Sequence, residues 1–190
     1  MYSKHKDKNF NELTDAEIDS MFSNFRNKFK DLHPKQQNIL RDWFGIWGQY
    51  ISFEYTFDPK KNGYYKRGDI VFAHFGYNIG SELGGKHYAV VVENDNNNAS
   101  KTVVVVPISS IDNNREKPLH SSEVYLGEVI PGSKVKSYAM PMQIRAISKL
   151  RIIKSKTLKK YGKIAITSKQ LSEIDKKIIN LYTKNLDIKY

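Results

Sequence analysis

Hydrophobic positions in the first part of the chain follow a helical spacing. Thr14 is suited to cap a helix, with Glu17 three residues later. The apolar residues that follow fall three or four positions apart and are Ile18, Met21, Phe22, Phe25 and Phe29. A helix is therefore predicted over residues 15–32. Pro34 suits the first turn of a second helix, whose apolar residues are Ile39, Leu40, Trp43, Phe44, Trp47 and Tyr50. The pattern predicts a helical hairpin.

The pattern changes from helical to extended after a polar, turn-rich segment at residues 58–63. Runs of β-branched and aromatic residues, bounded by Gly, Asn and Ser, are typical of strands. The predicted strands cover residues 68–75, 87–93 and 102–108, with shorter extended segments at 123–126 and 138–147. Thr167 or Ser168 then caps an amphipathic helix, whose apolar residues are Leu171, Ile174, Ile178, Ile179 and Leu181. We expect a mainly β (α+β) fold, with a helical extension at residues 1–60 and a β domain at 61–190.

Charge separates the same two parts. The chain has 190 residues, with 31 Lys and Arg against 20 Asp and Glu, and a net charge of +11. Residues 1–60 are neutral, so the whole excess lies in residues 61–190. No acidic residue lies between Glu128 and Glu173, where the basic residues are Lys134, Lys136, Arg145, Lys149, Arg151, Lys154, Lys156, Lys159, Lys160, Lys163 and Lys169. Such a run can be a solvated face, but an acid-free run of this length favours nucleic-acid binding.

Several classes of protein are excluded by composition. There is no cysteine, which rules out disulfides, thiolate zinc sites and Cys nucleophiles. No apolar run approaches the roughly 18–20 residues that span a bilayer, and the first residues lack the apolar core of a signal peptide. No histidine pair has the spacing of metal ligands. We expect a cytoplasmic protein without membrane contact, metal or cofactor.

Four segments in a fixed order carry a resemblance to a known family. They are KRGDIVFAHFG at residues 66–76, GSELGGKHYAVVVEND at 80–95, VVVVPISS at 103–110 and QIRAIS at 143–148. Over about residues 64–183 the chain resembles the MazF/PemK (Kid-like) family of toxin endoribonucleases. The resemblance implies an SH3-like small β-barrel with a C-terminal helix and a homodimer with a basic groove for single-stranded RNA. It also implies metal-free cleavage, in which the ribose 2′-OH attacks the adjacent phosphorus, and a cognate antitoxin that occupies the groove.

The resemblance assigns catalysis to His87 and Ser109. In the better-known ribonucleases of the family, an arginine followed by proline matches His87, and a threonine matches Ser109. Ser109 keeps the hydroxyl. An imidazole can act as acid or base at neutral pH, whereas arginine acts mainly as a fixed charge or proton donor. The PemK/Kid branch uses an Asp and an Arg where this chain has Met142 and Met140.

The same resemblance suggests RNA-binding residues, namely Ser81, Glu82, Lys86, Gln143 and Arg145. Lys86 could restore the missing cation beside His87. Gln143 and Arg145 match a family segment in which arginine either binds phosphate or braces the barrel. Glu82 either accepts hydrogen bonds from a base edge or anchors a turn. The glycines at positions 80, 84 and 85 are interpreted as serving the geometry of this loop.

Two questions stay open from the sequence. The leading hypothesis is an endoribonuclease toxin; the alternative is a noncatalytic binding module, either RNA-binding or similar to the related gyrase-poisoning toxins. The extension at residues 1–60 either covers an apolar face, enlarges the dimer, or inhibits the groove through acidic and aromatic residues such as Asp42, Trp43 and Trp47.

Overall fold

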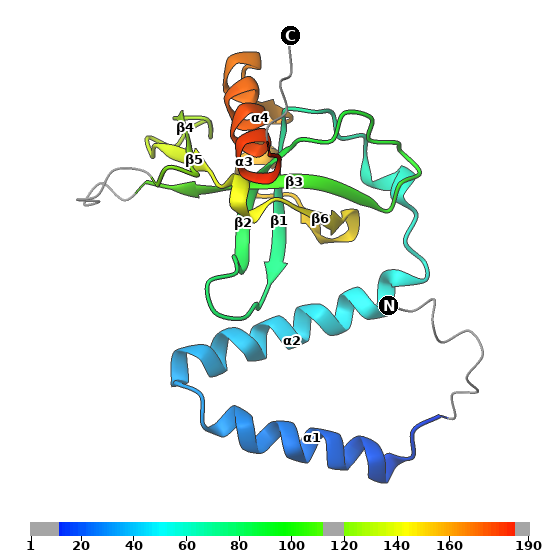
Figure 1. Cartoon of the computed structure of the whole chain (residues 1–190). Helices are drawn as coiled ribbons and strands as arrows, with labels where there is room; N and C mark the ends of the chain where they lie inside the picture. Colours follow the sequence, from blue (N-terminus) through cyan, green and yellow to red (C-terminus); the bar gives the residue numbers. More distant parts are fainter. Residues whose placement is uncertain (1–11, 112–119, 185–190) are drawn as a thin grey trace. The chain divides into compact units, whose positions relative to one another are not determined.

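The protein divides into two compact units, Met1–Phe44 and Gly45–Tyr190. The structure is a computed structural model that describes residues 12–111 and 120–184 (Figure 1). The division falls inside helix α2 (Pro34–Glu54), and not at the change of charge after Lys60. The predicted boundary after residue 60 stays a prediction.

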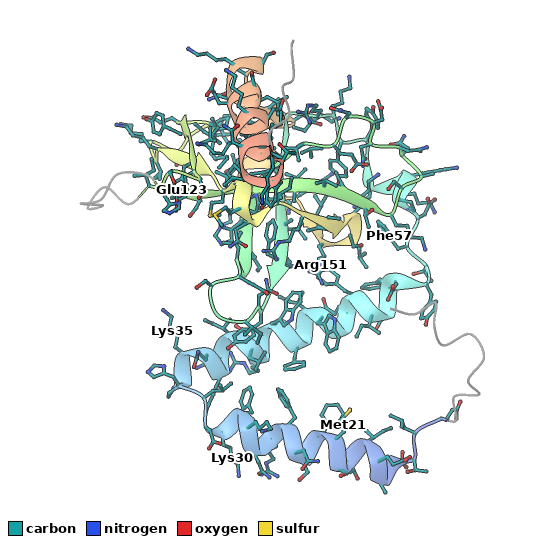
Figure 2. The ribbon with its side chains drawn as sticks, viewed as in Figure 1. Met21, Lys30, Lys35, Phe57, Glu123 and Arg151 are labelled. Atoms are coloured by element: carbon teal, nitrogen blue, oxygen red, sulfur yellow. The ribbon has the colours of Figure 1, made fainter. Side chains whose placement is uncertain are left out.

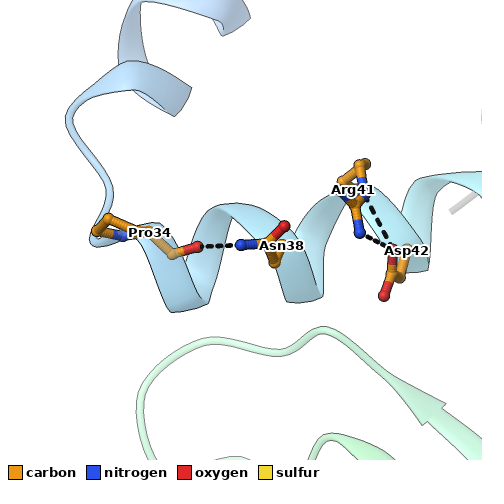
Figure 3. A network of polar contacts seen from close by, with 4 residues as sticks. All are labelled: Pro34, Asn38, Arg41 and Asp42. Atoms are coloured by element: carbon orange, nitrogen blue, oxygen red, sulfur yellow. Dashed lines mark hydrogen bonds and ion pairs between the residues drawn. The ribbon is translucent and has the colours of Figure 1, made fainter.

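The first unit contains α1 (Asp15–Lys30) and the first part of α2. The predicted cap is confirmed, because Thr14 and Glu17 form a capping box. The Phe25 and Phe44 rings meet edge to face, with centroids 5.2 Å apart. On the polar side of α2, Asn38 donates to the Pro34 carbonyl over 3.0 Å and Arg41 pairs with the neighbouring Asp42 over 2.8 Å (Figure 3). The hairpin follows the predicted helical spacing.

Burial in this first unit is slight. Its helix α1 has no buried residue, and Leu40 is the buried residue of α2. Met21 on α1, labelled in Figure 2, is 53% exposed, and Phe22 is 58% exposed. Helices of this length gain most of their stability from packing of an apolar face.

The second unit is built on an antiparallel sheet of eight strands. The strands are β1 (Asp69–Gly76), β2 (Gly85–Val91), β3 (Thr102–Ser110), β4 (Val124–Gly127), β5 (Ser137–Ala139), β6 (Arg145–Ser148), β7 (Ile152–Ile153) and β8 (Ile164–Ala165). Their order is β4-β5-β3-β2-β1-β7, while β6 also pairs with β3 and β8 with β1. The expected mainly β (α+β) class is confirmed. The SH3-like small β-barrel that the resemblance implies is not a closed barrel over the described residues. The end strands β4 and β7 do not pair with each other, because β6 and β8 pair only with β3 and β1.

Both faces of the central strands are buried. One face forms a core with the C-terminal helix α4 (Ser168–Tyr182), here called the helix-side core. It contains Ile70, Val90, Val92, Val106, Ile108, Val124, Leu126, Ile130, Ala139, Ile164, Ile166 and Ile174. The other face, here called the far-side core, contains Val71, Ala73, Phe75, Ala89, Val91, Val103, Val105 and Ile147. Burial on both sides explains why these strands read as continuous apolar runs.

The predicted C-terminal helix and its cap are confirmed, and α4 packs against the helix-side core. Thr167 caps it through a second capping box with Gln170, and the helix's own Ile174 is fully buried in this core. Gln170 also donates to the Leu126 carbonyl over 2.7 Å, which ties the helix to β4. Arg67, just before β1, donates to the Val92 carbonyl and pairs with Asp175 on the helix.

One predicted segment is wrong in detail. The extended segment expected over residues 138–147 is interrupted by η3 (Pro141–Gln143), which separates β5 from β6. Proline lacks the N–H that a ladder needs, and Pro141 stands at the start of this turn. Five further elements of the described residues were not predicted: η2 (Pro59–Asn62), η4 (Lys149–Arg151), α3 (Lys156–Tyr161) and the short strands β7 and β8.

Candidate functional site

The register of β2 and β3 places His87 and Ser109 on one face of the sheet. The two strands pair from Val91 with Val105 to Tyr88 with Ile108, and His87 and Ser109 follow directly beyond this last pair. Ile108 belongs to the helix-side core and Tyr88 packs against it. Because side chains alternate along a strand, His87 and Ser109 lie on the opposite face. His87 is also paired with Ala73 of the far-side core.

His87 is half-buried, and its two ring nitrogens have different surroundings. Nδ1 lies 3.4 Å from the Ile108 carbonyl oxygen. A proton on Nδ1 can be donated to that oxygen, which leaves Nε2 as the basic nitrogen. A Cβ atom at Gly85 would lie 4.0 Å from Nε2. The ring nitrogen that can exchange a proton therefore lies beside the exposed start of β2.

Phe75 connects His87 to Arg145. The Phe75 and His87 rings meet edge to face with centroids 6.3 Å apart, and the Arg145 guanidinium lies 5.5 Å from the Phe75 centroid. Arg145 pairs with Val105 across β6 and β3, so it lies on the far-side face as well. One phenyl ring, which is 1% exposed, thus positions a cation and an imidazole on the same face.

Gln143 fixes Arg145 and the loop between β1 and β2. Its Oε1 accepts a hydrogen bond from Arg145 Nη2 over 2.8 Å and one from the Leu83 backbone N–H over 3.2 Å. Its Nε2 donates to the Ser81 carbonyl over 3.4 Å. Both ends of the Gln143 amide are therefore engaged inside the protein. The structure places Gln143 as a brace between this loop and Arg145.

The loop at residues 77–84 carries two further predicted residues, Ser81 and Glu82. Both are exposed. The Glu82 backbone N–H donates to the Ile79 carbonyl over 3.2 Å in a turn. A Cβ atom at Gly84 would lie only 2.8 Å from the Gly76 carbonyl oxygen, so the two ends of the loop approach as closely as glycine allows. The loop is closed by its backbone and tied to the site through Gln143.

Lys86 does not join His87. It pairs with His74 across β1 and β2, and residues directly opposite one another share a face. His74 is buried, and its Nδ1 shares a hydrogen bond with the hydroxyl of Tyr50 from the last turns of α2. Burial, with Lys86 and Arg151 nearby, lowers the pKa of His74. Burial raises the pKa of Tyr50. Lys86 therefore belongs to a second group of side chains on the opposite face.

The basic run after Glu128 is not wholly a surface feature. Lys149 is fully buried, and its ammonium group donates to the Asn97 carbonyl over 2.8 Å. Burial lowers the pKa of this lysine. Lys149 therefore holds the turn after β6 against the loop before β3. Other members of the run, including Lys134 and Lys136, are exposed.

Sequence reasoning missed Phe75 as a site residue. It lies in a predicted strand, and an apolar residue there is expected in the core. The alternation of β1 would have placed it on the same face as Ala73, the strand partner of His87. The link from Phe75 to Arg145 needs the pairing of β6 with β3, which no local pattern predicts.

In the described part of the chain, a cavity lies away from the candidate site and no cluster of metal ligands is present. A cavity of about 680 Å³ lies along β1, β7 and β8, where Tyr65, Ile153, Lys159 and Lys163 contribute to its walls. None of the predicted site residues lines it. Among residues 12–111 and 120–184, no group of three or more His, Asp or Glu side chains is arranged to hold a metal ion. In the same residues no helix is long and apolar enough to cross a membrane.

A family model matches the part of the chain that carries the motifs. The family model of the PemK-like, MazF-like toxins of type II toxin–antitoxin systems matches residues 66–182, which is more than half of the chain. A comparison with curated protein sequences gives no match.

The solved structures that are similar to the chain include two from Deinococcus radiodurans. A crystal structure of MazF from Deinococcus radiodurans is 18% identical, with a TM-score of 0.43, over 63% of this chain and 97% of that one. A structure of MazE–MazF from the same organism is 17% identical, with a TM-score of 0.41, over 64% of this chain and 100% of that one.

Proposed function

We propose that this chain, which belongs to the PemK-like, MazF-like toxins of type II toxin–antitoxin systems, is an endoribonuclease that acts on single-stranded RNA in the cytoplasm. Cleavage proceeds by attack of a ribose 2′-OH on the adjacent phosphorus, without a metal ion. The products are a 2′,3′-cyclic phosphate and a free 5′-OH. The substrate and the reaction are those that the family resemblance implies.

One observation carries the proposal. His87, Ser109 and Arg145 come from three different strands and lie on the same face of the sheet. Together they offer an imidazole, a hydroxyl and a guanidinium. Phosphoryl transfer of this kind needs a group that takes the 2′-OH proton, a donor to the leaving oxygen, and positive charge near the non-bridging oxygens.

The roles follow from the chemistry of each group. His87 Nε2 exchanges the proton, either by taking it from the 2′-OH or by giving one to the departing 5′ oxygen. As the new bond from the 2′ oxygen to phosphorus forms, the bond from phosphorus to the 5′ oxygen breaks. Arg145 balances charge on the phosphate, and the Ser109 hydroxyl donates a hydrogen bond to it.

The partners are part of the proposal. RNA enters as a single strand, because only unstacked bases can be read by a protein groove. Membership of a type II toxin–antitoxin family supports a cognate antitoxin as the protein partner and a homodimer as the active form. The positive charge of residues 61–190 favours both RNA and an acidic antitoxin segment.

A cleavage assay tests the proposal. Purified protein is incubated with a long single-stranded RNA in EDTA, and the ends of the products are identified by mass spectrometry. We expect fragments that end in a 2′,3′-cyclic phosphate. Unaltered RNA at micromolar protein, with RNA binding retained, would contradict the proposal and support the noncatalytic binding module.

Two adjacent serines provide a matched comparison. Ser109 lies on the same face as His87, whereas Ser110 is the next residue of β3 and its side chain points to the other face. We expect Ser109→Ala to slow cleavage by about ten-fold or more, since a hydrogen bond to the transition state is lost. Ser110→Ala is expected to stay within about two-fold of the wild type. Equal rates for the two variants would remove Ser109 from the site.

A further inference from the structure

A row of side chains continues from the candidate site across the neighbouring strands. Ser109 of β3 pairs with Tyr138 of β5, and Tyr138 pairs with Tyr125 of β4. Paired residues in an antiparallel sheet share a face. The flanking pair, Val124 with Ala139, belongs to the helix-side core. Ser109, Tyr138 and Tyr125 therefore lie together on the face opposite that core, which is the face of His87.

Tyr125 lies at the solvent-exposed end of this row. Tyr125 is 52% exposed. Its ring lies along its own strand, with Cε1 and Oη 4.0 Å from the position of a Cβ atom on Gly127. Gly127 has φ of +73°, so a side chain there would be strained. The Tyr125 ring therefore lies against a part of β4 that carries no side chain.

Two exposed lysines, Lys134 and Lys136, precede β5 in the chain. Lys136 immediately precedes β5 and lies two positions before Tyr138, so its side chain points to the same face. Its carbonyl oxygen accepts a hydrogen bond from the Ile111 backbone N–H over 2.7 Å, which holds the residue in line with β3. Lys134 is exposed nearby in the sequence, and the acid-free run begins just before these lysines. An aromatic face beside lysines suits a strand of nucleic acid, because bases stack on the rings and phosphates meet the cations.

We propose that Tyr125 and Tyr138 form a stacking platform for bases of single-stranded RNA, two strands away from the cleavage site. Adjacent strands are about 4.8 Å apart, so Tyr125 lies about 10 Å from Ser109 across the sheet. Tyr125 stacks on a base, while Tyr138 supports the row between that base and the reacting phosphate. The platform lengthens the RNA site of the endoribonuclease, and in that respect it rests on the proposed function.

The affinity for an RNA that cannot be cleaved tests the platform independently of cleavage. The full chain and its variants are titrated with a fluorescent 2′-O-methyl RNA, which lacks the attacking hydroxyl. We expect Tyr125→Ala to weaken binding by about 5- to 100-fold, since one stacked base is lost. Tyr125→Phe keeps the ring and is expected to bind within about two-fold of the wild type. Tyr55→Ala, at a tyrosine that is 94% exposed and outside the sheet, serves as the control and is expected to change nothing.

An abasic scan separates a stacking contact from a structural effect. The same strand is made with each base removed in turn, and each is titrated with the wild type and Tyr125→Ala. We expect one or two abasic positions to weaken binding to the wild type. The same positions should not weaken binding to Tyr125→Ala any further, because the base and the Tyr125 ring are the two partners of one contact. An equal loss at every position in both proteins would overturn the platform.

Other outcomes are equally decisive. Wild-type affinity of Tyr125→Ala for the strand would overturn the inference while leaving cleavage by the wild type intact. If Tyr125→Ala changes the molecular mass of the protein in solution but not its affinity for RNA, this face binds a second copy of the chain. That result would also overturn the inference. If the wild type binds through Tyr125 but does not cut RNA, the platform stands and the endoribonuclease proposal fails.

Discussion

The two faces of the sheet at the start of β2 differ in what they can do. His87 points to one face, where the Phe75 ring and the Arg145 guanidinium lie beside it. Lys86 points to the other, where buried His74 shares a hydrogen bond with Tyr50 and Arg151 lies nearby. Two adjacent residues thus take part in separate groups of side chains.

The difference shows how strand alternation sorts functional from structural groups. On the His74 face, a histidine is held neutral by burial and neighbouring cations, so it suits a fixed hydrogen bond. On the His87 face, one ring nitrogen lies at the exposed start of the strand, so it suits proton exchange. Position in the pleat, and not sequence proximity, decides which residues can act together.

The largest effect is expected at the ring that joins the groups of the His87 face. Phe75→Ala leaves a cavity in the far-side core and should lower the free energy of unfolding by about 3–5 kcal/mol. Phe75→Leu should cost far less stability but still impair cleavage, because the ring against His87 and Arg145 is lost. Urea unfolding and RNA cleavage measure the two effects. Unchanged cleavage by a folded Phe75→Leu would show that the ring does not position the site.

A smaller effect is expected at the cation of the same face. Arg145→Lys keeps the positive charge but loses the planar group that donates to Gln143 and stacks on Phe75. Cleavage is expected to fall by about ten-fold, with thermal stability nearly unchanged. Steady-state kinetics on a short RNA give the comparison, and Lys101→Arg at an exposed position outside the site is the matched control. A large loss of stability in Arg145→Lys would instead make Arg145 a brace of the sheet.

The opposite face should respond to pH through stability. The folded state lowers the pKa of His74, so the unfolded chain takes up a proton first as the pH falls below about 6.5. The free energy that neutral His74 contributes is complete above that pH and declines as the pH falls toward the lowered pKa. Melting temperatures at pH 7.5 and 5.5 measure it. We expect the decline to be smaller in His74→Gln, which keeps a polar partner for Tyr50 but does not titrate. An equal decline in both proteins would contradict the account of His74.

The local parts of the fold could be read from the sequence. The apolar runs of β1, β2 and β3, the caps at Thr14 and Thr167, and the face of α4 follow from patterns within a few residues. The short strands could not be read in this way. β7 and β8 have two residues each and exist only because they pair with β1.

The candidate site was predictable only in part. The motifs suggested His87, Ser109 and Arg145, and the register brings them to one face. Lys86 was expected beside His87, but the alternation of β2 turns it away. Lys149 was counted in the basic run that favours nucleic-acid binding, but it is buried and donates to the Asn97 carbonyl. The row from Ser109 to Tyr125 depends on the pairing of three strands, which a single sequence does not contain. The role of residues 1–60 stays a prediction.

The smallest effect is expected at Lys86. The Lys86→Ala variant removes a cation from the His74 face and should leave the rate of RNA cleavage within about three-fold of the wild type. His87→Ala, one position away in the same strand, removes the group that exchanges the proton and should slow cleavage by about 100-fold or more. The two substitutions are matched in position and in loss of a basic side chain.

The ratio of these two rates tests the central claim most directly. Cleavage of the same single-stranded RNA is followed in EDTA, with circular dichroism to establish that both variants are folded. The account predicts that Lys86→Ala retains nearly full activity while His87→Ala loses almost all of it. Equal losses in the two variants, or a larger loss in Lys86→Ala, would contradict the assignment of cleavage to the His87 face.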